Sequence, residues 1–131
     1  MRAILDTSVI IAQGTDPAIS AHIPDEAAIS MATLAELHYG VLVAKTEAER
    51  QSRLRRLGLI EATFQPIPID AAVARAYASV AQAVKTGGGN PRARVMDLWI
   101  AATALSEGVP VVTRNRDDFK ILDKLIDVHA I

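Results

Sequence analysis

Two carboxylates stand in apolar surroundings in this 131-residue chain, where an acidic side chain is unusual. Glu36 lies within Met31–Leu37, and Asp97 lies within Val95–Ala102, and most residues of both segments are apolar. Burying an unpaired carboxylate costs free energy, so we expect each to be paired, protonated or bound to a cation. A simpler interpretation stays open for each residue. Glu36 would be a solvated helix position or the ion-pair partner of an arginine. Asp97 would be a residue of the first helical turn, where the helix dipole favours an acid.

Further acids follow segments that are predicted to be strands. Asp6 ends the β-prone run Arg2–Leu5, and Asp117 and Asp118 follow the β-branched run Val109–Thr113. In parallel sheets the carboxyl ends of the strands share one edge, where ligands bind. We therefore expect Asp6 to lie near one acid of the later pair. Helix capping by Asp6 and an ordinary polar turn are the simpler alternatives.

The donor set indicates which cation these acids would bind. The chain has no cysteine, and no two of its three histidines stand at metal-binding spacing. Oxygen ligands alone suit a hard cation, Mg²⁺ or Mn²⁺, and not zinc. Such ions catalyse phosphoryl transfer by activating water and stabilising charge. A carboxylate cluster also needs a cation to approach a phosphate without repulsion, so the pattern favours phosphodiester chemistry.

The elements that position these acids follow from hydrophobic spacing and capping residues. Strands are expected at 2–5, 27–30, 109–113 and 126–131, and helices at 9–12, 32–44, 46–63, 70–87 and 95–107. Pro66–Ile69 is expected to be extended, and Arg114–Phe119 to be a polar turn. Short apolar strands that alternate with helices predict an α/β fold with a parallel sheet covered on both faces. No linker or repeat divides residues 1–131, so we expect a single domain.

Composition narrows the classes of protein. Half of the residues are apolar and 22% are charged, which is typical of an ordered globular chain. No apolar run reaches the roughly 18 residues of a membrane helix, and no signal region is visible, so we expect a cytoplasmic protein.

Residues 48–94 carry eight basic and three acidic side chains, which suits either a polyanion-binding face or solvated helices. Aromatic residues are only 4%, so we predict packing roles for Tyr39 and Trp99 rather than base stacking.

Four segments, in order, resemble the motifs of PIN-domain ribonucleases, specifically the VapC-type toxins of bacterial toxin–antitoxin pairs. They read ILDTSVI at 4–10, LAELHYG at 34–40, DLWIAATA at 97–104 and VTRNRDDF at 112–119. The resemblance runs from residue 4 to at least 119, nearly the whole chain. It implies a three-layer fold in which helices flank a central parallel sheet of four to five strands.

The resemblance also implies an Mg²⁺-dependent endonuclease that cuts single-stranded or looped RNA. The four catalytic and metal-binding acids carried over from the family are Asp6, Glu36, Asp97 and Asp118. Asp117 is the alternative fourth acid, because the last motif varies in length. The acids are expected to hold one or two Mg²⁺ ions, with Mn²⁺ as a substitute, and to activate water for in-line attack. The expected products carry a 5′-phosphate and a 3′-hydroxyl.

Supporting roles fall to polar residues beside these acids. Asn115 matches a position that often supports the metal, and the hydroxyls of Thr7, Ser8 and Thr113 either orient ligands or make only capping and turn bonds. Arginine binds phosphate through a planar fork of donors, and the candidates for RNA binding are Arg92, Arg94, Arg114 and Arg116. For Arg92 and Arg94 the alternative is pairing with the carboxylates or with a partner chain.

The resemblance further implies a VapB-like antitoxin that covers the site and a homodimer. The rival function is a PIN-like module that binds RNA or protein without cleavage; loss of one acid would favour it, and all are present. A haloacid-dehalogenase-like phosphatase would need a second acid two residues after Asp6, where Ser8 stands. A receiver domain would need an acidic pair before its phospho-acceptor strand, and none stands there. The four motifs do not specify which RNA is cut.

Overall fold

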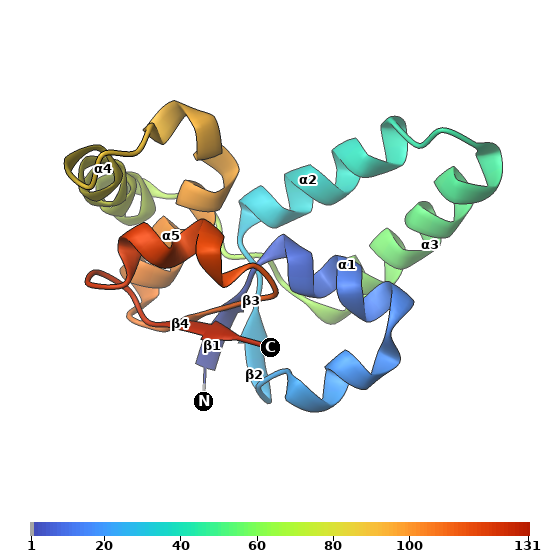
Figure 1. The fold of residues 1–131 in the computed structure, drawn as a ribbon. Helices are drawn as coiled ribbons and strands as arrows, with labels where there is room; N and C mark the ends of the chain where they lie inside the picture. Colours follow the sequence, from blue (N-terminus) through green and yellow to red (C-terminus); the bar gives the residue numbers. More distant parts are fainter. Residues whose placement is uncertain (1) are drawn as a thin grey trace.

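Four parallel strands form the centre of the molecule. The computed structural model describes residues 2–131. The strands are β1 (Arg2–Leu5), β2 (Glu26–Ala28), β3 (Val111–Thr113) and β4 (Val128–Ala130), in the order β2-β1-β3-β4. The predicted parallel sheet is confirmed with four strands (Figure 1). β2, β3 and β4 are each shorter than predicted.

Five α-helices and three short 3-10 helices surround this sheet. The α-helices are α1 (Thr7–Thr15), α2 (Met31–Leu42), α3 (Glu47–Thr63), α4 (Ala71–Thr86) and α5 (Val95–Glu107). The 3-10 helices are η1 (Pro17–His22), η2 (Pro91–Arg94) and η3 (Arg116–Leu122). The bounds of α5 are those predicted, whereas α1 is longer than predicted and η3 replaces much of the expected polar turn. Within residues 2–131 no helix is both long and apolar enough to cross a membrane.

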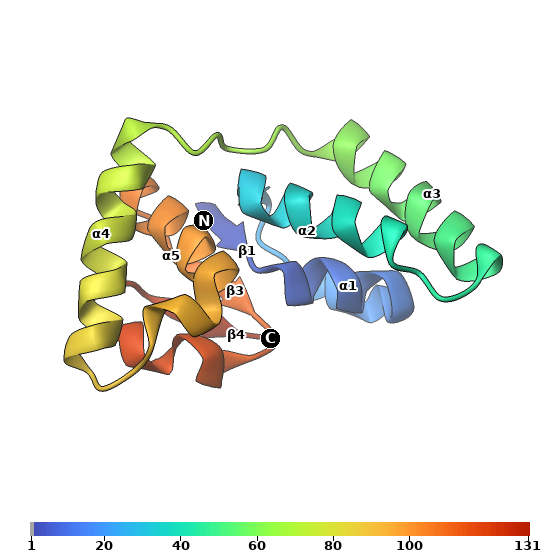
Figure 2. The same cartoon turned by 90° about the horizontal axis from the view of Figure 1, so that it is seen from above.

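The alternation of side chains along β1 divides the core into two halves. Ile4 faces a cluster that includes buried residues of α4, α5 and η3, whereas Ala3 and Leu5 face a cluster formed mainly with α1, η1 and α3. This alternation follows from the two-residue period of a strand. The sheet is therefore covered on both faces, as the three-layer prediction requires (Figure 2).

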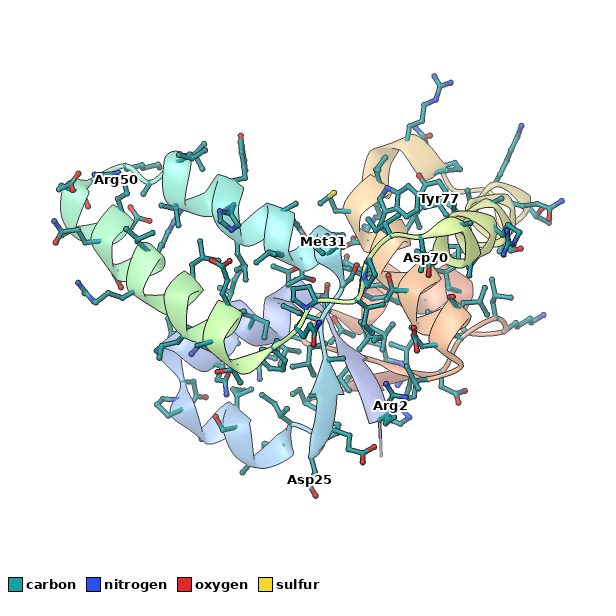
Figure 3. The ribbon with its side chains drawn as sticks, turned by 180° about the vertical axis from the view of Figure 1, so that it is seen from behind. Arg2, Asp25, Met31, Arg50, Asp70 and Tyr77 are labelled. Carbon is teal, nitrogen blue, oxygen red and sulfur yellow. The ribbon has the colours of Figure 1, made fainter. Side chains whose placement is uncertain are left out.

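Helices α2 and α3 form a hairpin that extends beyond the sheet. Thr46 caps α3 by accepting a hydrogen bond from the backbone N–H of Glu49 at 3.1 Å. Arg50 lies at the outer end of this hairpin (Figure 3), where it pairs with Glu47 at 2.9 Å. The arginines near the tip, Arg50 and Arg53, are thus paired within their own helix.

Local sequence signals set the ends of α4 and of α5, the helix that carries Asp97. Asp70, labelled in Figure 3, caps α4 by accepting a 2.9 Å hydrogen bond from the backbone N–H of Val73. α5 begins immediately after η2, which places Asp97 in its first turn. Gly108 ends α5 in the left-handed conformation with φ of 67°, which favours glycine. The chain then turns directly into β3 at the centre of the sheet.

Phe119 anchors η3 in the core, since its side chain is fully buried among the residues of α4, α5 and β3. We expect Phe119→Ala to lower the free energy of unfolding by about 3–5 kcal/mol, because it removes buried apolar surface and leaves a cavity. Urea unfolding followed by circular dichroism measures this loss. The matched control Lys120→Ala changes the next, exposed residue and should stay within about 0.5 kcal/mol. A loss below 1 kcal/mol for Phe119→Ala would contradict this view of the core.

Candidate functional site

An acidic groove lies between α2 and the start of α5. Its hollow encloses about 450 Å³ and is lined by Glu36 of α2 and by residues 93–97 of η2 and α5. Asp6 directly follows β1, and η3, which carries Asp118, follows β3. The strand ends and the two helices thus bring the four predicted acids to one edge of the sheet, where parallel α/β folds bind ligands.

Asp6 is held by two hydroxyl groups from different parts of the chain. Ser8 Oγ donates to Asp6 Oδ2 at 2.7 Å, and Thr113 Oγ1 donates to the same oxygen at 2.8 Å. Asp6 is only 4% exposed, and Oδ1 receives no hydrogen bond from any of the described residues. One oxygen is therefore fixed by the protein, while the other is left for a further partner.

The backbone orients these two hydroxyl groups. The N–H of Arg114 donates to Ser8 Oγ at 3.1 Å, and the N–H of Asn115 donates to Thr113 Oγ1 at 2.9 Å. A hydroxyl has a single proton to donate, so bonds received from the backbone direct that proton towards Asp6. The turn after β3 thus supports the carboxylate that follows β1.

Glu36 is oriented in a similar way by a pair of threonines. Thr7 Oγ1 donates to Glu36 Oε1 at 2.7 Å. Thr7 Oγ1 also lies 3.0 Å from Thr33 Oγ1, and Thr33 is buried. Because the Thr7 proton is used on Glu36, the proton between the two threonines comes from Thr33. Thr33 was not among the predicted site residues, although it stands three residues before Glu36 and so lies on the same helix face.

Burial and neighbouring charges shift the pKa values of two of these acids. Burial, together with the negative charges of Asp6, Asp118 and Glu36, raises the pKa of Asp97 to about 6, against the opposing effect of Arg94. Burial also raises the pKa of Glu36; a hydrogen bond from Thr7 opposes this shift, and the charge of Asp6 adds to it. Clustered like charges make the ionised state costly, so a cation among them would be stabilising.

The donor set fits a hard divalent cation, since every candidate ligand is a carboxylate oxygen. In the conformation described for residues 2–131, no three acidic or histidine side chains are placed to share one ion. Asp118 instead accepts a 2.5 Å hydrogen bond from Arg94 Nη1, and the same nitrogen lies 3.7 Å from Asp97 Oδ2. For Arg94, the pairing with carboxylates that was the alternative to RNA binding is the contact observed.

The remaining candidates lie around the groove with exposed side chains. Asp117 is exposed, whereas its neighbour Asp118 is half-buried and turned to Arg94, which favours Asp118 as the fourth acid. Of the four arginines predicted to bind RNA, three are exposed and make no ion pair with the residues that the structure describes: Arg92, Arg114 and Arg116. Asn115 is also exposed and contributes its backbone N–H, not its side chain, to the network around Asp6.

The prediction that both Tyr39 and Trp99 pack inside the protein is wrong for Tyr39. Its side chain is 66% exposed, because it lies on the outer part of α2, where the hairpin leaves the sheet. Trp99 does pack, with its ring stacked on Tyr77 of α4 at a centroid distance of 4.0 Å. The stacked pair joins α4 to α5 on the buried side of the helices.

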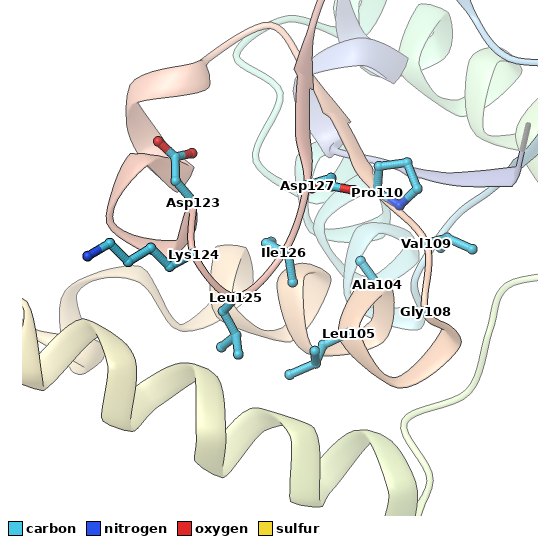
Figure 4. Close-up of a pocket in the computed structure, with 10 residues that line it drawn as sticks. All are labelled: Ala104, Leu105, Gly108, Val109, Pro110, Asp123, Lys124, Leu125, Ile126 and Asp127. Atoms are coloured by element: carbon cyan, nitrogen blue, oxygen red, sulfur yellow. The ribbon is translucent and has the colours of Figure 1, made fainter.

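A second hollow, of about 260 Å³, lies at the opposite edge of the sheet. It is lined by the α5–β3 loop and by the segment that precedes β4 (Figure 4). Its charged lining residues are Asp123, Lys124 and Asp127, none of which belongs to the predicted site. The chemistry expected from the sequence therefore belongs to the acidic groove alone.

Asp97 should make stability depend on pH in protein freed of metal by EDTA. Its raised pKa means that the folded state takes up a proton as pH falls through about 6, whereas the unfolded chain does so nearer 3.8. The charged form is therefore destabilising above pH 6, and this destabilisation disappears towards pH 4. Solvent screens the half-buried group, so we expect Asp97→Asn to raise Tm at pH 7.5 by about 3–4 °C, with the gain lost at pH 4.

Thermal unfolding at several pH values measures this effect. Asp25→Asn is the matched control, because Asp25 is exposed in the turn before β2, and it should give no such gain at pH 7.5. A gain for Asp97→Asn that was equal at pH 7.5 and pH 4 would contradict the assignment.

Comparison with known proteins places this arrangement in a family. Residues 3–125 match the PIN domain. The chain is 41% identical over 129 residues to "Ribonuclease VapC5" of Mycobacterium tuberculosis, which covers 98% of this chain and 93% of that protein. It is 31% identical over 132 residues to "Ribonuclease VapC" of Rickettsia bellii, which covers 95% and 93%, respectively.

Solved structures agree with this assignment. The crystal structure of VapBC-5 from Mycobacterium tuberculosis, described as a member of the VapBC family of toxin–antitoxin systems, superimposes with a TM-score of 0.82 at 41% identity. The match covers 99% of this chain and 97% of that one. The crystal structure of FitAcB from Neisseria gonorrhoeae gives a TM-score of 0.79 at 29% identity over 98% and 96% of the two chains. The chain therefore belongs to the PIN domain family and, within it, to the VapC ribonucleases.

Proposed function

We propose that this protein is an Mg²⁺-dependent endoribonuclease and the toxin of a VapBC-type toxin–antitoxin pair. The observation that carries the proposal is that four carboxylates gather at one edge of the sheet, where Asp6, Glu36 and Asp118 lie close enough to Asp97 to raise its pKa and hydroxyl groups orient Asp6 and Glu36. The names of the relatives support the ribonuclease activity, and the structural neighbours that contain both VapB and VapC support the antitoxin.

The four acids, Asp6, Glu36, Asp97 and Asp118, are the residues that would hold the metal. Their all-oxygen donor set suits Mg²⁺, and Mn²⁺ is the expected substitute. When bound, the metal supplies Lewis-acid activation of water and offsets the charge that develops on the phosphate. One or two ions are compatible with this donor set.

The chain's own side chains prepare the site before RNA arrives. Ser8 and Thr113 hold one oxygen of Asp6, which leaves Oδ1 facing its next partner. Thr7 fixes Glu36 across the groove. Ligands that are held in position lose less conformational entropy on binding a cation and a phosphate, which favours catalysis.

RNA is proposed to lie along the groove, where positively charged side chains would bind its phosphates. The side chains proposed to contact its phosphates are Arg92, Arg94, Arg114 and Arg116, of which Arg92, Arg114 and Arg116 are exposed and without ion pairs among the described residues. A cytoplasmic RNA is the proposed substrate. A homodimer and a VapB-like antitoxin, whose tail covers the groove, complete the proposed assembly.

Incubation of the purified protein with total bacterial RNA tests the activity. We expect discrete cuts with 5′-phosphate ends in Mg²⁺ or Mn²⁺, because the acids need the cation to approach a phosphate. EDTA should abolish the cuts, and Asp97→Asn should slow cleavage by at least about 100-fold, since it removes a proposed ligand. Sequencing of the ends identifies both the RNA and the chemistry.

The control for this experiment is protein freed of any bound antitoxin and shown to be folded. Binding of RNA and Mn²⁺ without any cut would contradict the nuclease and support the alternative, a PIN-like module that binds RNA or protein without cleavage. Cuts that persist in both EDTA and Asp97→Asn would indicate a contaminating nuclease.

The adjacent pair Asp117 and Asp118 gives a matched test of the fourth acid. We expect Asp118→Asn to lower kcat by at least about tenfold, because Asp118 faces the groove, and Asp117→Asn to change it by less than twofold, because Asp117 is exposed. Cleavage of the RNA identified above, measured at saturating Mn²⁺, compares them. The reverse order of effects would assign the role to Asp117.

A further inference from the structure

We propose that Arg94 is a built-in counter-cation of the acidic groove, which a divalent metal ion must displace from Asp118 before all four acids can act together. This inference rests on the proposed function, because it concerns the same site and the same metal. It adds a role that the RNA-binding prediction for Arg94 did not contain. The guanidinium neutralises the carboxylates in the metal-free protein, and its removal is part of the cost of metal binding.

The position of one nitrogen carries the proposal. Arg94 Nη1 donates to Asp118 Oδ1 at 2.5 Å and lies 3.7 Å from Asp97 Oδ2. Asp97 and Asp118 belong to α5 and η3, and the guanidinium lies between these two elements. A cation shared by both carboxylates would need the space between them. The arginine and the metal ion would therefore compete for the same two carboxylates.

The exposure of Arg94 indicates that the guanidinium can leave. Its side chain is 49% exposed, whereas those of Asp97 and Asp118 are 26% and 32% exposed. Ion pairs with an exposed partner contribute little to stability, because water and salt compete for them. The long arginine side chain can turn into solvent by rotation of its own bonds, without movement of the backbone. A divalent ion can therefore displace it at a modest cost.

Unlike Asp118, the acids Asp6 and Glu36 are held by short side chains that cannot turn away into solvent. Asp6 is held by Ser8 and Thr113, and Glu36 is held by Thr7. Asp118, by contrast, has Arg94 as its side-chain partner. Asp118 is therefore the acid whose side-chain partner can leave most easily, and in the described conformation of residues 2–131 no three acids yet share one ion position.

Binding of Mn²⁺, followed by the electron paramagnetic resonance signal of the unbound ion, tests the competition without any measurement of activity. The proteins compared are the wild type, Arg94→Gln, Arg94→Lys, Lys120→Gln and Asp97→Asn. Lys120→Gln is the matched charge control, because it removes one positive charge from η3 two residues after Asp118, from an exposed side chain. Circular dichroism establishes that each variant is folded.

We expect Arg94→Gln to bind Mn²⁺ about three- to tenfold more tightly than the wild type, and Lys120→Gln to bind it less than twofold more tightly. Arg94→Lys should lie between the wild type and Arg94→Gln, because lysine keeps the charge but not the planar fork of donors. Equal gains in Arg94→Gln and Lys120→Gln would overturn the inference and indicate a general effect of net charge. Weaker binding by Arg94→Gln would also overturn it, since Arg94 would then be positioning Asp118 for the metal.

The same series separates this inference from the proposed function. Loss of binding in Asp97→Asn together with no gain in Arg94→Gln would retain the metal site and reject the counter-cation. Absence of Mn²⁺ binding in every protein, Arg94→Gln included, would reject both. Absence of binding in the wild type with binding in Arg94→Gln would support the inference in its strongest form.

A second measurement follows the guanidinium itself. The arginine side-chain signals of isotopically labelled protein are recorded without metal and with saturating Mg²⁺, and the Arg94 signals are identified by their absence in Arg94→Gln. We expect rotation about the Nε–Cζ bond of Arg94 to accelerate at least fivefold on addition of Mg²⁺, because loss of the bond from Nη1 to Asp118 frees the guanidinium. A rotation rate unchanged by Mg²⁺ would overturn the displacement.

Discussion

Mutual repulsion among carboxylates is the constraint on which the rest of this structure depends. A parallel sheet brings the ends of β1 and β3 to one edge, and α2 and α5 add one acid each beside that edge. The charged forms of Asp97 and Glu36 are expensive to maintain beside the other acids, and the pKa of each is raised. The protein offsets this with several separate devices: hydroxyl donors for Asp6 and Glu36, a guanidinium for Asp118 and Asp97, and the first helical turn of α5 for Asp97.

These devices differ in how firmly they hold their acid. The hydroxyl donors to Asp6 come from buried or half-buried residues that are themselves oriented by backbone N–H groups. The donor to Asp118 comes from an exposed and flexible side chain. The site thus combines an acid that is held rigidly, Asp6, with one whose partner can move, Asp118. This difference follows from the elements that carry them. The rigid part is built on strand ends, and the adaptable part is built on two short 3-10 helices, η2 and η3.

Much of the fold and the identity of the acids could be predicted from the sequence, because both depend on local patterns. The apolar run after Val95 and the glycine at 108 set the bounds of α5 correctly. What could not be predicted depends on contacts between distant segments. The donation from Thr33 to Thr7 joins residues 26 positions apart, and Arg94 meets Asp118 across 24 positions. Tyr39 was misplaced because its helical spacing does not reveal that α2 extends beyond the sheet that would have covered it.

The hydrogen bond from Thr113 to Asp6 joins two segments that are 107 residues apart in the sequence. A ribosome that has released only the first hundred residues has produced Asp6, Glu36 and Asp97, but neither the hydroxyl that fixes Asp6 nor the strand β3 that pairs with β1. Contacts of such long range also close late in folding. The site is therefore assembled only after β3 and Thr113 have been synthesised, so a chain that stops before residue 111 lacks both the support for Asp6 and the strand that pairs with β1.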